Sequence, residues 1–348
     1  MAYTTINKST DYFNTKLYTG NGSTQNITGV GHQVDWTWIK HRTDTEGHAL
    51  FDVLRGALDR VQTNSTNASS SQAGTVTAFG SDGFSLGNNA EVNANNGSYV
   101  SFNWKANGAG SANTDGSINT TATSVSTTSG VSISTYTGTG SNATVGHGLG
   151  AVPKMIMVKK TSGSESWGVY HHSIGNTKFL QLNATGAEGT SSAFWNNTTP
   201  TSSVFSIGTE NGVNQSGQTY VAYCFADVQG FSKVGGSYTG NGNADGTFVY
   251  TGFKPAFVML KYSAPGGGVG SWHMYDNKRK GYNTENDYVQ ANTTSSENSD
   301  TDQVDLLSNG FKCRATGSDS NENGSTYIYM AFAEAPLVGS NNVPCTAR

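Results

Sequence analysis

Short apolar runs separated by Gly, Asn and Ser turns recur along the chain, and the clearest run occurs three times. Each copy opens on one aromatic residue and closes on another, at Tyr99 and Trp104, Tyr220 and Phe225, and Tyr327 and Phe332. Such short apolar, aromatic-rich runs predict β-strands, and because strand side chains point to alternate faces, the two rings of each run, five positions apart, lie on opposite faces. We therefore expect one ring of each pair in a core and the other on a surface.

Three further kinds of strand precede each of these runs. The first covers residues 34–40, 153–159 and 255–261, each ended by Lys, and its second and third copies are apolar on both faces, as in the middle of a sandwich. An aromatic strand follows at 48–52, 167–171 and 272–276. The next strands are predicted at 81–87, 204–208 and 307–312, where Asp82-Gly83 and Asn309-Gly310 indicate tight hairpin turns.

The motif Tyr-Thr-Gly-x-Gly opens each series, at residues 18–22, 136–140 and 238–242. The same strands follow it each time, so we interpret the chain as three tandem copies of an antiparallel β-sandwich of roughly 100 residues, a common domain size. We place the repeats at 17–106, 131–230 and 231–348, the last with a C-terminal tail.

The remaining segments are a lead-in and a linker. Residues 1–16 are too few for a domain and are interpreted as a docking segment. Residues 107–130 are rich in Gly, Ser and Thr, which indicates a flexible linker, although Ile118 and Val125 also suggest an extra exposed strand. Helical spacing occurs only around residues 49–61, where a short turn of helix after Asp52 is compatible with the pattern and a long helix is not.

Composition and charge narrow the function. Only 13% of the residues are charged, 11% are aromatic and the formal net charge is −4. The aromatic content indicates a folded chain, and the lack of a basic excess argues against nucleic-acid binding. With no secretion signal and no long apolar run, we expect synthesis in a cytoplasm and no membrane insertion.

The repeats resemble a domain of virion and tail-fibre proteins of tailed phages, especially marine ones. The resemblance rests on the first motif, residues 29–31, 36–40, 50–52 and 81–84, the strand 99–105, and the closing stretch 331–336. It departs from the family pattern at residues 32–34, and the second copy lacks the Asp-Gly turn. It implies a lectin-like sandwich, of the jelly-roll or concanavalin type, and a place in the virion with other virion proteins as partners.

Catalytic and metal motifs are weak. His171, His172 and His273 lie on or beside the aromatic strand and are interpreted as structural, because no nucleophile or carboxylate pair accompanies them. Asp319 to Gly324 matches the first half of a calcium loop, but Met330 stands where a bidentate Glu belongs, which leaves a looser ion site or a turn. We expect no enzyme activity, no cofactor and no metal.

The other candidate chemistry concerns glycines and cysteines. The glycines at 20 and 22 are read as turn residues, because no helix or Lys follows them as in a phosphate-binding loop. Cys224 and Cys313 are expected to be buried and free, with a disulfide or a reactive thiol as the alternatives, and Cys345 is the third cysteine.

Aromatic rings beside amides suggest a carbohydrate site, because a ring offers an apolar face and an amide binds hydroxyls. The candidate ligand-binding residues are Trp195, Asn196, Trp272, Tyr282 and Asn283. We therefore expect a non-enzymatic virion structural protein, first of all a tail fibre or adhesin that displays loops to a host-surface glycan and gains avidity as a homo-oligomer. A capsid decoration or head-fibre protein and a glycan depolymerase remain as alternatives.

Overall fold

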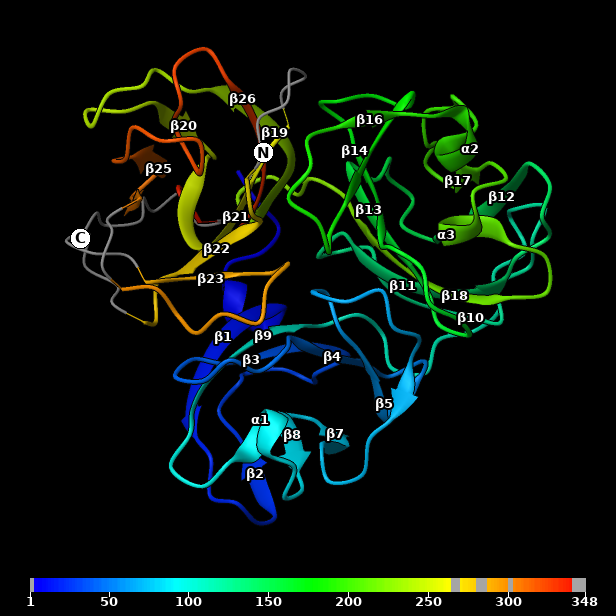
Figure 1. Cartoon of the computed structure of the whole chain (residues 1–348), viewed down its shortest axis with the longest axis horizontal. Helices are drawn as coiled ribbons and strands as arrows, with labels where there is room; N and C mark the ends of the chain where they lie inside the picture. Colours follow the sequence, from blue (N-terminus) through cyan, green and yellow to red (C-terminus); the bar gives the residue numbers. More distant parts are fainter. Residues whose placement is uncertain (1–2, 264–269, 280–286, 300–302, 340–348) are drawn as a thin grey trace.

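The computed structural model describes residues 3–263, 270–279, 287–299 and 303–339. Three large antiparallel sheets lie around a common centre (Figure 1). The first has the order β1 (Phe13–Thr19), β9 (Ser98–Trp104), β3 (Trp36–His41), β4 (Ala49–Asp52), β5 (Gly56–Val61) and β6 (Ser70–Ser71). The prediction of an all-β chain is confirmed.

The second and third large sheets keep the same order for the strands that correspond. The second runs β10 (Ala122–Ser126), β11 (Val131–Thr137), β18 (Thr219–Phe225), β13 (Met155–Lys160), β14 (Gly168–His171), β15 (Lys178–Gln181) and β16 (Gly189–Thr190). The third runs β19 (Ser232–Thr239), β26 (Thr326–Pro336), β21 (Phe253–Tyr262), β22 (His273–Asp276) and β23 (Tyr288–Gln290). In each sheet the strand that carries the motif tyrosine therefore pairs with the last strand of its repeat.

A small sheet lies against each large one. The three are β2 (Gln25–Ile27), β8 (Gly83–Leu86) and β7 (Val76–Gly80); β12 (Ala143–Gly146) and β17 (Val204–Ile207); and β20 (Phe248–Tyr250), β25 (Gly310–Cys313) and β24 (Val304–Leu307). Helices are single turns: the 3-10 helix η1 (Ser9–Asp11), α1 (Ala90–Asn93), α2 (Ser192–Trp195) and α3 (Asn211–Asn214). The pattern at 49–61 forms the hairpin β4–β5, because the Asp52 carboxylate accepts hydrogen bonds from the amides of Leu54 and Arg55 and fixes the turn.

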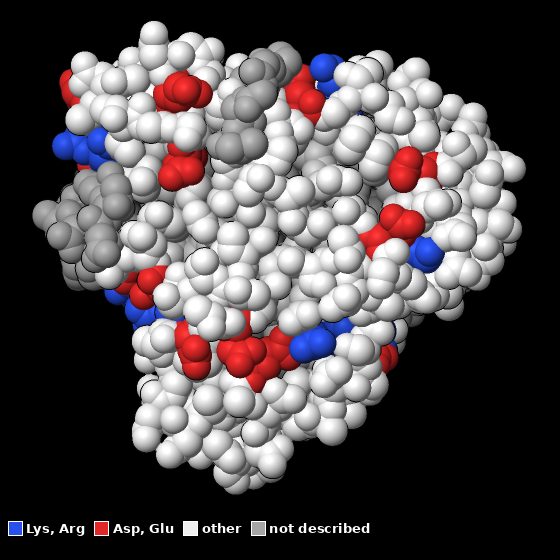
Figure 2. All heavy atoms as spheres, in the orientation of Figure 1, with Lys and Arg blue, Asp and Glu red and all other residues white. Residues whose placement is uncertain are grey.

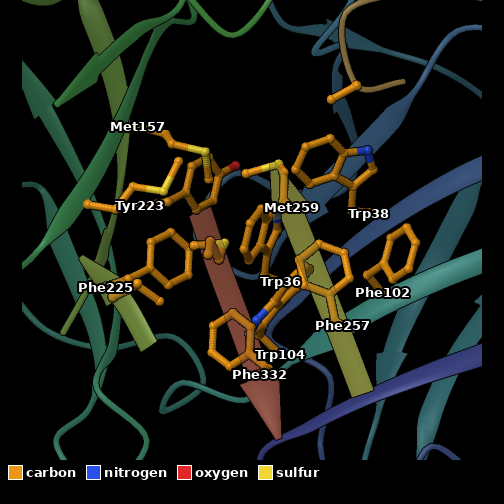
Figure 3. Packing of buried hydrophobic residues seen from close by; sticks show 14 of the residues in the cluster. Trp36, Trp38, Phe102, Trp104, Met157, Tyr223, Phe225, Phe257, Met259 and Phe332 are labelled. Carbon is orange, nitrogen blue, oxygen red and sulfur yellow. The ribbon is translucent and has the colours of Figure 1, made fainter. Parts of the chain in front are cut away.

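The three large sheets share one hydrophobic core (Figure 3). The Trp36 ring lies 4.1 Å from the Trp104 ring of its own sheet and 4.6 Å from the Tyr223 ring of the second sheet, centroid to centroid. Phe225 of the second sheet and Phe332 of the third have ring centroids 6.2 Å apart. The three sheets are therefore not parts of independent domains, because each large sheet buries its inner face against the other two.

This shared core corrects the expectation that one ring of each last strand lies on a surface. Tyr99, Tyr220 and Tyr327 enter the cores between the large and small sheets, whereas Trp104, Phe225 and Phe332 enter the central core. The rings do face opposite sides of the strand, as period two requires. Both sides are interior.

Residues 107–130 also differ from the expected flexible linker. They include β10, which pairs with β11 and extends the second large sheet, as the suggestion of an extra strand anticipated. Ile118 is buried, and its amide donates a 3.0 Å hydrogen bond to the Thr144 carbonyl in β12. The segment is ordered by backbone pairing, which composition alone does not reveal.

The lead-in is likewise part of the fold. Ile6 and Phe13 are buried in the central core, and the Phe13 ring stacks on Phe332 at 5.0 Å. β1 begins at Phe13, a few residues before the expected boundary at 17. Residues 3–16 are thus held against the third sheet, which corrects their interpretation as a separate docking segment.

Few charged side chains appear on the face shown in Figure 2, and they are scattered among uncharged residues. Within the described ranges no helix is long and apolar enough to cross a membrane.

Candidate functional site

The Tyr-Thr-Gly-x-Gly motifs are structural units with the same contacts in all three copies. The first tyrosine stacks on the tyrosine of the last strand, with ring centroids 5.0 Å apart for Tyr18 and Tyr99. The corresponding pairs, Tyr136 with Tyr220 and Tyr238 with Tyr327, stack at 5.1 Å. The first glycine is required by space, since a Cβ on Gly20 would lie 2.2 Å from the Ala94 carbonyl oxygen. These observations support the interpretation as turns.

One buried asparagine fixes each motif loop. Asn93 accepts a hydrogen bond from the Asn21 amide at 2.9 Å, and its own amide donates to the carbonyls of Ser23 and Gly87. Asn214 and Asn321 make the corresponding contacts in the second and third repeats. Asn321 lies in the segment that resembled half of a calcium loop, so its side chain is already engaged and the segment is a turn. No group of three or more His, Cys, Asp or Glu side chains suited to a metal occurs in the described ranges.

The lysines at the ends of β3, β13 and β21 join neighbouring repeats. The Nζ of Lys159 donates to the Thr66 carbonyl of the first repeat at 2.9 Å, and that of Lys261 donates to Thr185 of the second at 2.8 Å. The Nζ of Lys40 donates to the Thr294 carbonyl of the third repeat at 3.2 Å, so that each repeat is joined to both of the others. Burial lowers the pKa of Lys40 and Lys159 to about 8 and that of Lys261 to about 7, whereas the surrounding carbonyl oxygens favour the ammonium form.

The three histidines do not form one cluster. His171 is buried in β14, where its Nδ1 accepts a hydrogen bond from the Ser173 amide at 3.2 Å, whereas His172 is exposed. His273 is buried in the third sheet, 3.9 Å from the Asp319 carboxylate. Burial lowers the pKa of both His171 and His273 to about 4, so both rings are neutral near pH 7.

The predicted ligand-binding residues do not make one site. Trp195 and Trp272 are buried, so neither can offer a ring face to a sugar, and this part of the prediction is wrong. The Trp272 indole instead donates a 3.0 Å hydrogen bond to the Gln181 carbonyl of the second sheet. Asn196 ends α2 in a left-handed conformation with φ 50°, and Tyr282 and Asn283 lie outside the described residues.

The described cysteines are free and buried, as expected for small hydrophobic residues. Cys224 lies in the core of the second repeat and Cys313 in that of the third. Burial raises the pKa of both thiols. Cys345 lies outside the described residues.

A groove of about 410 Å³ runs between the first and second large sheets. One side of the groove belongs to the first large sheet and is lined by Leu54, Arg55, Asp59 and Ser69. The other side belongs to the second large sheet and the residues next to it, and is lined by Thr121, Thr135, Thr161 and Thr219. The Arg55 guanidinium is held in place and its donors are used within the protein. It donates to the Asp52 carboxylate, the Leu50 and Asp59 carbonyls, and the Ser69 and Tyr223 hydroxyls.

Three polar groups of this groove are free to bind a ligand. No described residue hydrogen-bonds to the Asp59 carboxylate or to the hydroxyls of Thr121 and Thr135. Leu54 adds an apolar surface, and Leu58, 38% exposed, lies in the same hairpin. A carboxylate, hydroxyls and aliphatic groups together suit a polyhydroxylated ligand, which has both O–H donors and C–H faces. No local pattern in the sequence predicts this groove, because it depends on the packing of two large sheets.

A second exposed feature is β20. Phe248 and Tyr250 are 46% and 55% exposed, whereas Val249 between them is buried. The alternation of two aromatic residues around one valine is the sequence signal for this aromatic strand face, which was not among the predicted sites.

The fold and its surface define an all-β protein in which three sheet pairs are fused through one core. Residues 8–336 match the model of the family described as a domain of unknown function, DUF7483, and the chain belongs to this family. The matched range includes every described strand and therefore spans all three large sheets. A comparison with curated proteins finds no match.

Proposed function

We propose that this chain is a non-enzymatic structural protein of a tailed-phage particle, a tail fibre or adhesin that binds a host-surface saccharide. The resemblance of its repeats to phage virion domains supports the assignment to a phage particle. The groove between the first two large sheets supports the proposal that the ligand is a saccharide. It is the observation on which the whole proposal depends most.

At the level of the fold, we propose three copies of one ancestral sandwich of the jelly-roll or concanavalin type. The equal strand order of the three large sheets and the repeated asparagine and lysine contacts support common descent. The packing of the copies around one centre makes a rigid support, because the relative positions of the sheets are fixed by buried contacts.

The groove is suited to saccharide because its free groups are held in place by that support. Thr135 lies in β11 and Thr121 just before β10, while Asp59 lies in β5 of the other sheet. Because rigid strands already hold these groups in place, less conformational entropy is lost when a ligand binds. A single such site is expected to bind weakly, so copies on one particle would act together through avidity.

Two experiments test the proposal. Gold-labelled antibody on intact particles is expected to mark the tail. Label on the head alone would favour the alternative of a capsid decoration or head-fibre protein, and no label on the particle would overturn the virion assignment.

Saccharide binding is tested with purified host polysaccharide and the full chain. Asp59→Ala together with Thr135→Ala is expected to reduce retention on immobilised polysaccharide about tenfold or more, the loss expected for hydrogen bonds to a charged group and a hydroxyl. Asp115→Ala, at an exposed aspartate outside the groove, is the matched control. Equal retention of both variants would contradict the groove, and new reducing ends in the polysaccharide would indicate a depolymerase instead.

A further inference from the structure

The small sheets have equivalent edge strands, and one of them is already paired with an extra segment. The strands β2, β12 and β20 correspond because Ile27, Val145 and Val249 each pair with a phenylalanine of the next strand in the sheet. In the second repeat, the Ile118 amide donates to the Thr144 carbonyl, and the Thr144 amide donates to the Ser117 hydroxyl at 2.9 Å. The residues around Ile118 thus add to β12 in the parallel direction.

The corresponding edge of the third repeat has no paired strand at Phe248 and Tyr250 in the described structure, and just beyond it the Tyr3 hydroxyl donates to the Gly252 carbonyl at 2.7 Å. Cys313 donates its amide to the Thr247 carbonyl, and Thr251 donates to Asn309. Hydrogen-bonded positions alternate in an antiparallel pair, so the backbone groups of Phe248 and Tyr250 point away from β25. β20 pairs with β25 alone, and outside that pairing no described residue bonds to those backbone groups. Phe248 therefore presents the same amide and carbonyl that Thr144 uses in the second repeat.

Side chains distinguish this edge from that of the first repeat. The positions that correspond to Phe248 and Tyr250 are Asn26 in β2 and Thr28 directly after it, and both are exposed polar residues. Open edges in native proteins are usually short, charged or covered, and exposed aromatic residues are typical of interfaces. A strand added to β20 would pair its backbone and bury part of both rings.

We infer that β20 is the acceptor for an extended segment of a partner polypeptide in the particle. The segment pairs parallel to β20, as the chain's own Ser117 and Ile118 pair with β12. By the same chemistry it carries a hydroxyl residue followed by a branched aliphatic one. In Figure 1, β20 lies at the upper left and the strands beside the saccharide groove, β5 and β10, at the lower right, so attachment and ligand binding would use opposite sides. The inference does not require that the groove bind saccharide.

The test uses the full chain and a fluorescent peptide with the sequence of residues 114–121. We expect saturable binding by anisotropy, and slower hydrogen exchange at the amides of Phe248 and Tyr250 when the peptide is bound. A peptide with proline in place of the isoleucine lacks the pairing amide and is expected to bind about tenfold more weakly or worse. Absence of saturable binding, or protection elsewhere in the chain, overturns the inference.

Variants of the chain provide a matched pair. Phe248→Pro removes an outward amide without removing a bond to β25, and it is expected to weaken the peptide about tenfold or more. Asn26→Pro makes the same change at the edge of β2 and should leave binding unchanged. If Phe248→Pro unfolds the chain, the exchange measurement on the unmodified protein still decides.

Other occupants of the edge give different results. Sedimentation that shows a dimer, lost in Phe248→Lys, would assign the edge to a second copy of the chain. Peptide binding only after removal of residues 340–348 would assign it to the chain's own end. Protection of Phe248 and Tyr250 by polysaccharide would assign the surface to saccharide. Each of these results overturns the assignment to a partner segment.

Discussion

The indole Nε1 of Trp167 donates a 2.9 Å hydrogen bond to the carbonyl oxygen of Gln62 and so joins the second sheet to the first. Trp272 makes the corresponding bond to Gln181, from the third sheet to the second. At the remaining junction the residue is His48, whose Nε2 lies 2.9 Å from the Gln290 carbonyl oxygen of the third sheet. One cyclic set of polar contacts therefore surrounds the aromatic centre.

Trp167→Phe is expected to lower the free energy of unfolding by about 1–3 kcal/mol beyond the loss from the smaller ring, because the Gln62 carbonyl remains buried without its donor. Urea unfolding measures the difference. Trp36→Phe is the control, since Trp36 is buried in the same core and its Nε1 has no partner among the described residues. Equal losses in the two variants would show that the hydrogen bond contributes nothing.

Lys159→Met is expected to destabilise the chain by about 2–4 kcal/mol, because the carbonyls of Thr66 and Glu165 lose a buried donor. Lys8→Met removes a lysine whose side chain is 66% exposed and should change stability by less than about 0.5 kcal/mol. Thermal and urea unfolding of both variants measure this. A neutral Lys159→Met would mean that the second sheet is held without this contact.

Asn214→Ala is expected to open the second motif loop, because the Thr139 amide and the carbonyls of Ser141 and Gly208 lose their partner. We expect a loss of about 2–3 kcal/mol and faster hydrogen exchange at Thr139. Asn142→Ala, at an exposed position in the same loop, is the control. Unchanged exchange at Thr139 would contradict a role for Asn214 in fixing the loop.

Acid is expected to destabilise the chain through His171. Burial lowers the pKa of this ring to about 4 from its ordinary 6.5, so below pH 6.5 the unfolded chain binds a proton that the folded chain does not. Stability is therefore complete above about pH 6.5 and declines as the pH falls towards 4, by up to about 3 kcal/mol for this group.

The variant His171→Asn isolates that contribution. Its stability should fall less between pH 7 and pH 5 than that of the unmodified chain, as measured by urea unfolding at each pH. His172→Asn, at the exposed neighbour, should keep most of the original pH dependence. Identical pH profiles for the His171 variant and the unmodified chain would show that His171 does not cause the decline.

Strands could be predicted from the sequence because they depend on local periodicity and on turn residues. The run from Tyr220 to Phe225 is a strand in the structure, with its two end rings on opposite faces, as period two requires. Its surroundings could not be predicted, because alternation does not say whether a face meets water or another sheet. A signal was available in that residues 220–225, like 153–159 and 255–261, are apolar on both faces.

The candidate sites depend on long-range packing and were harder to predict. Trp195 and Trp272 were predicted to bind a ligand because they are aromatic residues beside polar ones. A large ring, however, is more often buried than exposed. Asp59 and Thr135 meet only because the first two sheets pack together. Phe248 and Tyr250 were accessible to sequence reasoning, since their counterparts in the other repeats are small or polar.

The shared core also limits how such a chain can evolve. Deleting one repeat would leave Trp104, Phe225 or Phe332 facing water together with the neighbouring side chains of the central cluster, and the ring of lysine contacts would be broken. Loss of a single copy is therefore expected to destabilise the other two, so that the three sheet pairs would be retained together.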